Sequence, residues 1–280
     1  MLKVRFFVLL GAILLMGLLG MVSAFAWFTQ KPPVVDLTAA DPQGRGLAEV
    51  VAEDFLAGRV SPVPVASGVT MRPGAAVTTQ GALSWDGFST FVLGGSRTEL
   101  HRFLFVRTTG ADPAKPVLEL MRLSVLVTIP AGGNPVLAAQ PHFGPASWSS
   151  SEVVTDYSDL ESVALPSSAQ EQITSWATAW ASGDAEKLRL LTGDATPKVR
   201  YVGLGGYQLK DVRVVSALLA GQDAFLVRAR VVLSSANESI LEMDMDLTIK
   251  SASTGLPNVV GWGPAGSGIL TPADVRVSEE

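Results

Sequence analysis

The chain has 280 residues, of which 48% are hydrophobic and 7% are aromatic, and its formal net charge is −5. This apolar content is enough for packed cores and excludes a disordered chain, while the acidic balance argues against direct binding to nucleic-acid phosphates. The sequence contains no cysteine, which excludes a disulfide framework and a thiol nucleophile.

The first long element is an apolar run, FFVLLGAILLMGLLGMVSAFAWF, which fills residues 6–28 without a charged side chain. A helix with a rise of about 1.5 Å per residue would here be about 34 Å long, enough to cross a hydrocarbon core of about 30 Å. We therefore expect one transmembrane helix over residues 6–28, preceded by a cytoplasmic tail over residues 1–5. The residues expected to anchor it in the membrane include Phe6, Leu10, Leu14, Leu18, Val22, Trp27 and Phe28.

Basic residues set the expected orientation of this helix. Lys3 and Arg5 precede the run and only Lys31 closely follows it, so the positive-inside rule places the amino terminus in the cytoplasm. The expected location is the cell membrane, with a single pass and the bulk of the chain extracytoplasmic. A cleaved signal peptide is the alternative, because residues 24–26 (Ala-Phe-Ala) fit a small-x-small cleavage pattern. Against it, the apolar run is longer than the usual core of a signal peptide, about 7–15 residues.

Two polar stretches divide the exported part. Residues 29–43 contain three prolines and no helical periodicity, which predicts a stalk. Residues 148–166 are rich in serine and acidic side chains and predict an interdomain linker. They delimit a first domain over residues 44–147 and a second over residues 167–270, with a C-terminal tail over residues 271–280.

The first domain opens with a helical pattern. Leu47, Val50, Val51 and Phe55 have the spacing of one helix face, and Gly58 is expected to end the helix.

The second domain opens in the same way. Ser168 and Glu171 have the spacing of a capping box, Gly183 is expected to end the helix, and Asp184 is expected to cap a further short helix. The apolar face of the longer helix consists of Ile173, Trp176, Ala177 and Trp180.

Both segments then turn to strand-forming sequence and end alike. VLELMRLSVLVTI in the first and ILEMDMDLTI in the second each lead to an aromatic residue two positions before a Pro-Ala pair. Glu119 and Glu242 lie 123 residues apart, and Pro145 and Pro264 lie 119 apart, so the period has the size of a whole domain. We predict two copies of an α+β fold, each a curved antiparallel sheet with helices packed on its concave face.

Three stretches carry a resemblance to a known family: the helical ITSWATAWASGDAEKLRLLTG, the strand region YVGLGGYQLKDVRVV and the ending VVGWGPAG. Each half resembles the cystatin-like cone of the nuclear transport factor 2 superfamily. A membrane-anchored chain with two such cones looks like the conjugative-transposon TcpC family. The resemblance implies a bacterial membrane component similar to the inner-membrane scaffold subunit of type IV secretion systems. It also implies self-association and contacts with other channel subunits.

Residues that could carry catalysis or bind a metal are few. His101 and His142 lie 41 residues apart without a neighbouring ligand pattern, and we expect both to be structural. We expect no catalytic residue, no cofactor and no metal. The glycines in residues 203–206 lack the Lys-Ser/Thr of a phosphate loop and predict a turn or a strand kink.

Three acidic side chains alternate along the strand ILEMDMDLTI. Glu242, Asp244 and Asp246 would share one face, which could bind a divalent cation or a partner. We favour a solvated sheet face, because hairpin pairing sets Arg228 and Arg230 opposite Asp244 and Asp246 or one pair along.

Two functions remain open from the sequence. The first is a non-enzymatic scaffold subunit of a conjugation channel that acts through protein–protein contacts. The alternative is an exported small-molecule-binding module, or an isomerase or dehydratase, that uses the cone cavity. Such an enzyme would need Asp54 or His101 in that cavity, and Trp176 and Trp180 could line its mouth.

Overall fold

The computed structural model describes residues that all fall within one compact unit, Leu37–Glu280. The described ranges are 41–93, 96–109, 115–146, 160–193, 199–220, 224–236, 238–250, 257–266 and 276–278. Within these ranges, no helix combines the length and apolar character needed to cross a membrane. The predicted tail, anchor and most of the predicted stalk lie outside the described residues.

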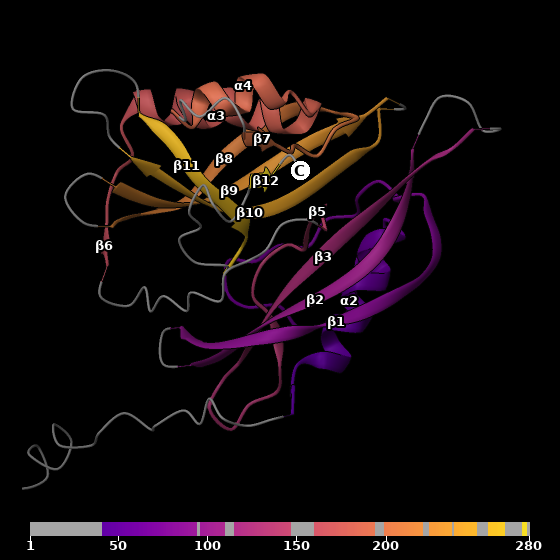
Figure 1. Ribbon diagram of the computed structural model, residues 1–280. Coiled ribbons are helices and arrows are strands. Elements are labelled where there is room, and N and C mark those ends of the chain that lie inside the picture. The colour runs from indigo at the N-terminus through magenta and orange to yellow at the C-terminus, as the bar shows by residue number, and fades with distance from the viewer. Residues whose placement is uncertain are drawn as a thin grey trace, which may run out of the picture. The chain divides into compact units, whose positions relative to one another are not determined.

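The described residues of the first half of the unit form one helix and one antiparallel sheet (Figure 1). Three long strands follow each other as neighbours, and two short strands both pair with the third. The helix packs against this sheet and buries Val51 and Phe55. The elements are α2 (Arg45–Leu56), β1 (Thr79–Leu93), β2 (Ser96–Thr109), β3 (Val117–Ile129), β4 (Val136–Leu137) and β5 (His142–Pro145).

The second half repeats this order. Two helices precede the long strands of a sheet whose order is β11-β10-β9-β8-β6, and the short β6 of this sheet comes before the helices in the chain. Figure 1 shows both helices over one face of the sheet. A separate two-stranded ladder joins β7 to β12. The elements are β6 (Glu161–Ser162), α3 (Ser167–Ser182), α4 (Ala185–Leu191), β7 (Val199–Tyr201), β8 (Tyr207–Leu219), β9 (Ala224–Ser235), β10 (Ile240–Lys250), β11 (Asn258–Pro264) and β12 (Arg276–Ser278).

The expected α+β class with antiparallel sheets and few helices is therefore confirmed, whereas the division into two domains stays a prediction. The repeated Pro-Ala endings have the same register. Pro145 lies opposite Met121 in the first sheet, and Pro264 lies opposite Met245 in the second. The equivalent methionines are thus 124 residues apart, not 123. The sequence match of Glu119 with Glu242 is wrong by one residue, because strand alternation would put them on opposite faces.

The helix ends agree with the sequence in part. Gly183 ends α3 with a φ of 77°, and Asp184 Oδ1 accepts a hydrogen bond of 3.0 Å from the backbone N–H of Lys187 at the start of α4. The predicted capping box of Ser168 and Glu171 is wrong. The helix begins earlier, directly after Pro166, and no side chain caps it.

Two segments expected to be irregular contain strands. Glu161–Ser162, inside the expected linker, forms β6 and pairs with the end of β8. Arg276–Ser278, inside the expected tail, forms β12 and pairs with β7. The turn expected in residues 203–206 is confirmed, because Gly205 and Gly206 have positive φ angles of 69° and 74° just before β8.

Candidate functional site

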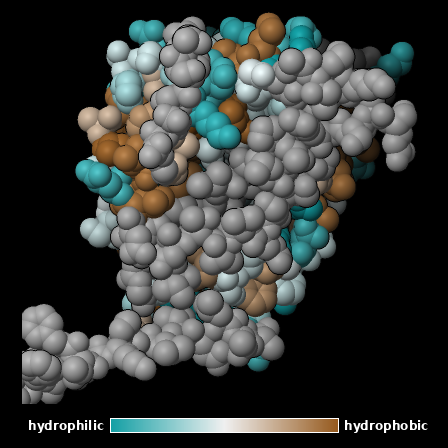
Figure 2. All heavy atoms as spheres, turned by 60° about the vertical axis from the view of Figure 1, so that its left-hand side comes forward, coloured by the Kyte–Doolittle hydropathy of each residue, from teal (hydrophilic) through white to brown (hydrophobic). Residues whose placement is uncertain are grey.

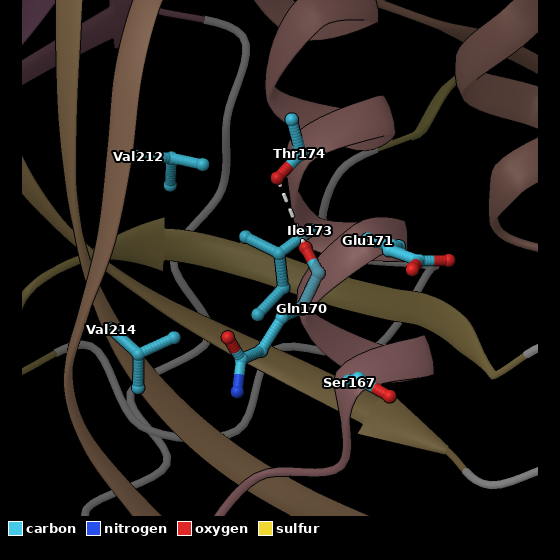
Figure 3. Close-up of a pocket in the computed structure, with 7 residues that line it drawn as sticks. All are labelled: Ser167, Gln170, Glu171, Ile173, Thr174, Val212 and Val214. Atoms are coloured by element: carbon cyan, nitrogen blue, oxygen red, sulfur yellow. Dashed lines mark hydrogen bonds between the residues drawn. The ribbon is translucent and has the colours of Figure 1, made fainter.

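A pocket lies between α3 and the edge of the second sheet. Figure 3 shows Val212 and Val214 on β8 facing Ile173 and Gln170 on α3. The Oγ1 hydroxyl of Thr174 donates a hydrogen bond of 3.0 Å to the backbone carbonyl of Gln170. The pocket thus has an apolar floor and a polar rim. Its volume is about 300 Å³, and it is lined by Ser167, Gln170, Glu171, Ile173, Thr174, Val212 and Val214.

A second pocket of about 290 Å³ lies at the end of α2, beside β1 and β2. Glu53 is the ionisable residue in its lining, which otherwise includes Leu56, Val77 and Phe105. Neither Asp54 nor His101 belongs to it. The Asp54 carboxylate instead accepts a hydrogen bond of 2.8 Å from Arg59 Nε. The two candidates for an enzymatic cavity are therefore not brought together here.

The two tryptophans expected at a cavity mouth lie in the core of the second half. Trp176 and Trp180 are fully buried, and their rings stack with centroids 5.8 Å apart. Trp262 on β11 packs against Trp176 at 5.3 Å. Neither Trp176 nor Trp180 lines the pocket beside α3. These indoles fill the space between the helix and the sheet.

His142 links the two halves through its ring. It lies on β5 of the first half and stacks on Trp180 of α3 with ring centroids 5.9 Å apart. Complete burial lowers the pKa of His142 to about 3, because the charged imidazolium loses its hydration. The ring is therefore neutral at neutral pH, and its position agrees with the structural role expected for it.

Glu99 is a fully buried residue of β2 whose carboxylate lies against the N-terminus of α2. Gly44 is the N-cap residue of α2 and has no side chain with which to cap it. The backbone N–H of Gly44 donates to Glu99 Oε2 at 2.8 Å, and that of Gln43 donates to Oε1 at 3.2 Å. Glu99 on β2 thus supplies the acceptor and the negative charge that a helix N-terminus favours.

Two further side chains surround this carboxylate. Arg97 Nη2 lies 2.7 Å from Glu99 Oε1, and His101 Nε2 lies 3.0 Å from Oε2. Burial lowers the pKa of His101, and the negative charge of Glu99 opposes that effect. The His101 ring also stacks on Phe88 at 5.7 Å. The cluster joins β2 to α2, so His101 has the structural role that the sequence suggested.

The acidic residues of β10 pair with the arginines of β9 in one of the two expected registers. Asp244 lies opposite Arg230, and Asp246 lies opposite Arg228. Each pair is bidentate, and the guanidinium Nε atoms lie 2.8 Å from the Oδ1 atoms of Asp244 and Asp246. The hydrogen bond that Arg230 donates to Asp244 raises the pKa of Arg230, against the effect of burial.

The prediction that these acids lie on a solvated face is wrong. The side chains of Asp244 and Asp246 are only 3% and 2% exposed. The backbone N–H of Gln140 in the first half donates to Asp244 Oδ2 at 2.9 Å, and that of Gly266 donates to Asp246 Oδ2 at 2.7 Å. Both carboxylates are therefore engaged by guanidinium and amide groups. No group of three His, Asp or Glu side chains among the described residues could hold a metal ion.

Arg107 makes a second polar contact between the halves. Its Nε donates to Glu119 Oε2 at 2.8 Å, and its Nη2 donates to the backbone carbonyl of Leu204 at 2.8 Å. Its guanidinium also lies 5.6 Å from the centre of the Tyr207 ring. Burial raises the pKa of Tyr207, and the positive charge of Arg107 opposes this. The ring of Phe143 packs against Tyr207 at 6.5 Å.

These contacts define the class of molecule: two α+β halves of the same strand order, joined by buried polar groups and aromatic rings. No protein-family model matches the chain, and no curated protein matches it. Among solved structures, the chain is similar to one described as an Ntf2-like protein involved in plasmid conjugation. The match has 12% identity and a TM-score of 0.32, and it covers 69% of this chain and 79% of the other. A match this weak carries no argument about function.

Sequence reasoning missed two of these features. Arg97, Glu99 and His101 alternate along one strand, and this spacing already places them on one face. Their link to Gly44 depends on a contact across 55 residues, which no local pattern reveals. The contacts of Gln140 and Arg107 with the second half are likewise long-range.

Proposed function

We propose that this chain is a non-enzymatic, membrane-anchored scaffold subunit of a conjugative DNA-transfer apparatus, a type IV secretion system. Its extracytoplasmic part would act through contacts with other channel subunits and with further copies of itself. The resemblance of the sequence to the TcpC family supplies the biological setting. The architecture of the described part supplies the physical argument.

One observation carries the proposal: the buried charged side chains of the described residues act as connectors. Glu99 binds the N-terminus of α2, and Asp244 receives both Arg230 and the backbone N–H of Gln140. Arg107 reaches the carbonyl of Leu204 in the other half. A catalytic cone needs an acid or base that is free to meet a substrate. Groups held in this way stabilise a rigid body, which suits a spacer or scaffold.

The small-molecule alternative has a definite place to act, the pocket between α3 and β8. Its volume lies at the lower end of the range for ligand sites, about 300–1,000 Å³. Its lining contains Glu171 as the ionisable residue and no histidine. The proposed scaffold role therefore predicts that filling this pocket leaves function unchanged.

The experiment measures plasmid transfer from donor cells. Deleting residues 1–28 or residues 167–280 should reduce transfer to the background of a strain without the gene. Thr174→Trp, which fills the pocket at an exposed position of its lining, should leave transfer unchanged. Normal transfer by either deletion strain would overturn the proposal. Loss of transfer in Thr174→Trp with a folded protein would favour the small-molecule alternative.

A further inference from the structure

The edge of the second sheet is open along most of β8. On one side, β8 pairs with β9 over its whole length. On the other, Leu218 and Leu219 pair with β6, and Ala217 accepts a hydrogen bond from Val163. Among the described residues, no strand lies beside residues 207–216 on that side. Such an edge presents unpaired backbone groups to a further strand.

Two bulges limit where a further strand could pair. The ladder between β8 and β9 shifts between Leu209 and Asp211, and again between Val214 and Ser216. A bulge interrupts regular pairing and twists the strand. The four residues from Asp211 to Val214 therefore form the regular part of the open edge. Any partner strand is confined to this run, which allows few registers.

The side chains of this run are of two kinds and range from half-buried, at Asp211 and Val212, to exposed, at Arg213 and Val214. Val214 is 37% exposed, and with Val212 it lines the pocket beneath α3 (Figure 3). On the opposite face, the side chains of Asp211 and Arg213 are 42% and 61% exposed. Figure 2 shows hydrophobic and hydrophilic side chains interspersed on the visible face of the molecule. An added strand would thus meet valines on one face of the sheet and charges on the other.

A row of charges runs across the sheet towards this edge. Asp244 on β10 lies opposite Arg230 on β9, and Arg230 lies opposite Arg213 on β8. Two arginines directly opposite each other repel. Asp211, two residues along the same strand, relieves this with a contact of 2.6 Å to Arg213 Nε. An acidic side chain on the open side of Arg213 would reduce the repulsion between Arg213 and Arg230 further.

We propose that β8 pairs with β8 of a second copy of this chain, antiparallel and centred on Val212. In this register, Asp211 of each copy lies opposite Arg213 of the other, and the two Val212 side chains lie opposite each other. The row then reads Asp244, Arg230, Arg213 and the second copy's Asp211. Centring the pair on Arg213 would instead set two arginines opposite each other. This interface specifies the self-association that the proposed function includes.

The cysteine-free sequence permits a direct test by cross-linking the full chain in membranes. Residues directly opposite in antiparallel strands have Cβ atoms about 4.5–5.5 Å apart, close to the range of a disulfide. Val212→Cys should therefore give a covalent dimer on mild oxidation. Arg213→Cys should not, because the two copies of residue 213 lie about 8 Å apart diagonally. Val50→Cys, exposed on α2, measures random collision.

Charge reversal then tests the register. In the Val212→Cys background, Asp211→Lys and Arg213→Glu should each lower the dimer yield about tenfold, since each creates two like-charge contacts. The two reversals together should restore the yield. Circular dichroism checks that each variant is folded.

The proposal is overturned if Val212→Cys cross-links no more than Val50→Cys, or if the double reversal fails to restore the dimer. This failure is distinguishable from failure of the proposed function, because the two deletion strains test plasmid transfer without reference to β8. If transfer needs residues 1–28 and 167–280 but β8 does not cross-link, the proposed function holds and the copies associate through another surface.

Discussion

Phe143 and Trp262 occupy equivalent positions in the two halves of the molecule. Phe143 lies opposite Leu123 in the first sheet, Trp262 lies opposite Leu247 in the second, and both rings are fully buried. Each stands two residues before the proline of the repeated ending. The repeated aromatic-Gly-Pro-Ala ending therefore has the same packing role in each half. It places one large ring in the core beside the third long strand.

Replacing either ring by alanine should destabilise the protein strongly. A large buried aromatic replaced by alanine typically costs about 3–5 kcal/mol through lost burial and the cavity left behind. Phe143→Ala and Trp262→Ala should both show this loss in urea unfolding followed by circular dichroism. Leu190→Ala, at a position 62% exposed, is the control and should change stability by less than about 0.5 kcal/mol.

Phe143→Ala should also affect both halves together. Its ring packs edge-on against Phe105 at 5.6 Å in the first half and against Tyr207 at 6.5 Å in the second. We expect its fluorescence and circular dichroism transitions to coincide and to shift by the same amount. Transitions that separate would mean that the halves unfold independently, which contradicts a structural link through Phe143.

Glu99→Gln should destabilise the first half although the shape of the side chain is kept. The amide loses the negative charge that faces the N-terminus of α2 and the guanidinium of Arg97. Breaking a buried charged pair on one side costs about 3–5 kcal/mol. The matched control is Glu49→Gln, whose exposed pair with Arg45 is worth about 0.5 kcal/mol. Equal losses in the two variants, measured by urea unfolding, would refute the role of Glu99.

The sequence predicted the elements whose signal is local. The helix face around Trp176, the left-handed Gly183 and the cap at Asp184 depend on spacing within a few residues, and the structure confirms them. In the first helix Val51 and Phe55 are buried as predicted, but Val50 is 46% exposed, so its predicted place on that face is wrong. Strand alternation likewise predicted that Asp244 meets an arginine of the neighbouring strand.

The sequence did not predict what covers these elements. Alternation along the strand predicts a surface position for Asp244. It cannot reveal that the backbone of Gln140, 104 residues earlier, covers this side chain. Glu99 reads as an ordinary strand residue for the same reason. Burial of charge in this chain depends on contacts between segments far apart in the sequence, and such contacts leave no periodic pattern.

Asp244 and Arg230 offer a test of how the halves are joined. Asp244→Ala leaves the guanidinium of Arg230 and the backbone N–H of Gln140 without their acceptor, and should cost about 3–5 kcal/mol. Replacing both partners, as Arg230→Met with Asp244→Leu, removes the unpaired charge and should recover part of this loss. A remainder of about 1–3 kcal/mol is expected from the orphaned amide of Gln140. Full recovery in a urea titration would show that the Gln140 contact contributes nothing.

Acid should destabilise the fold through its buried histidines. Burial lowers the pKa of His142 from 6.5 to about 3 and also lowers the pKa of His101. Near pH 6.5 these histidines bind protons in the unfolded chain but not in the folded chain. Their contribution to the free energy of unfolding is therefore complete above that pH and falls as the pH drops below it. For His142 alone, the loss between pH 7.5 and pH 5 should be about 2 kcal/mol. Urea midpoints measured from pH 7.5 to pH 5 give this slope, and they avoid the range in which most carboxylates titrate.

His142→Phe should lower the slope even if it changes the stability at pH 7.5, because phenylalanine binds no proton in either state. His101→Gln should lower it further for the same reason. If His142→Phe has the same slope as the natural chain, the His142 ring binds protons equally well in the folded and unfolded states. This result would contradict the complete burial of His142 against Trp180.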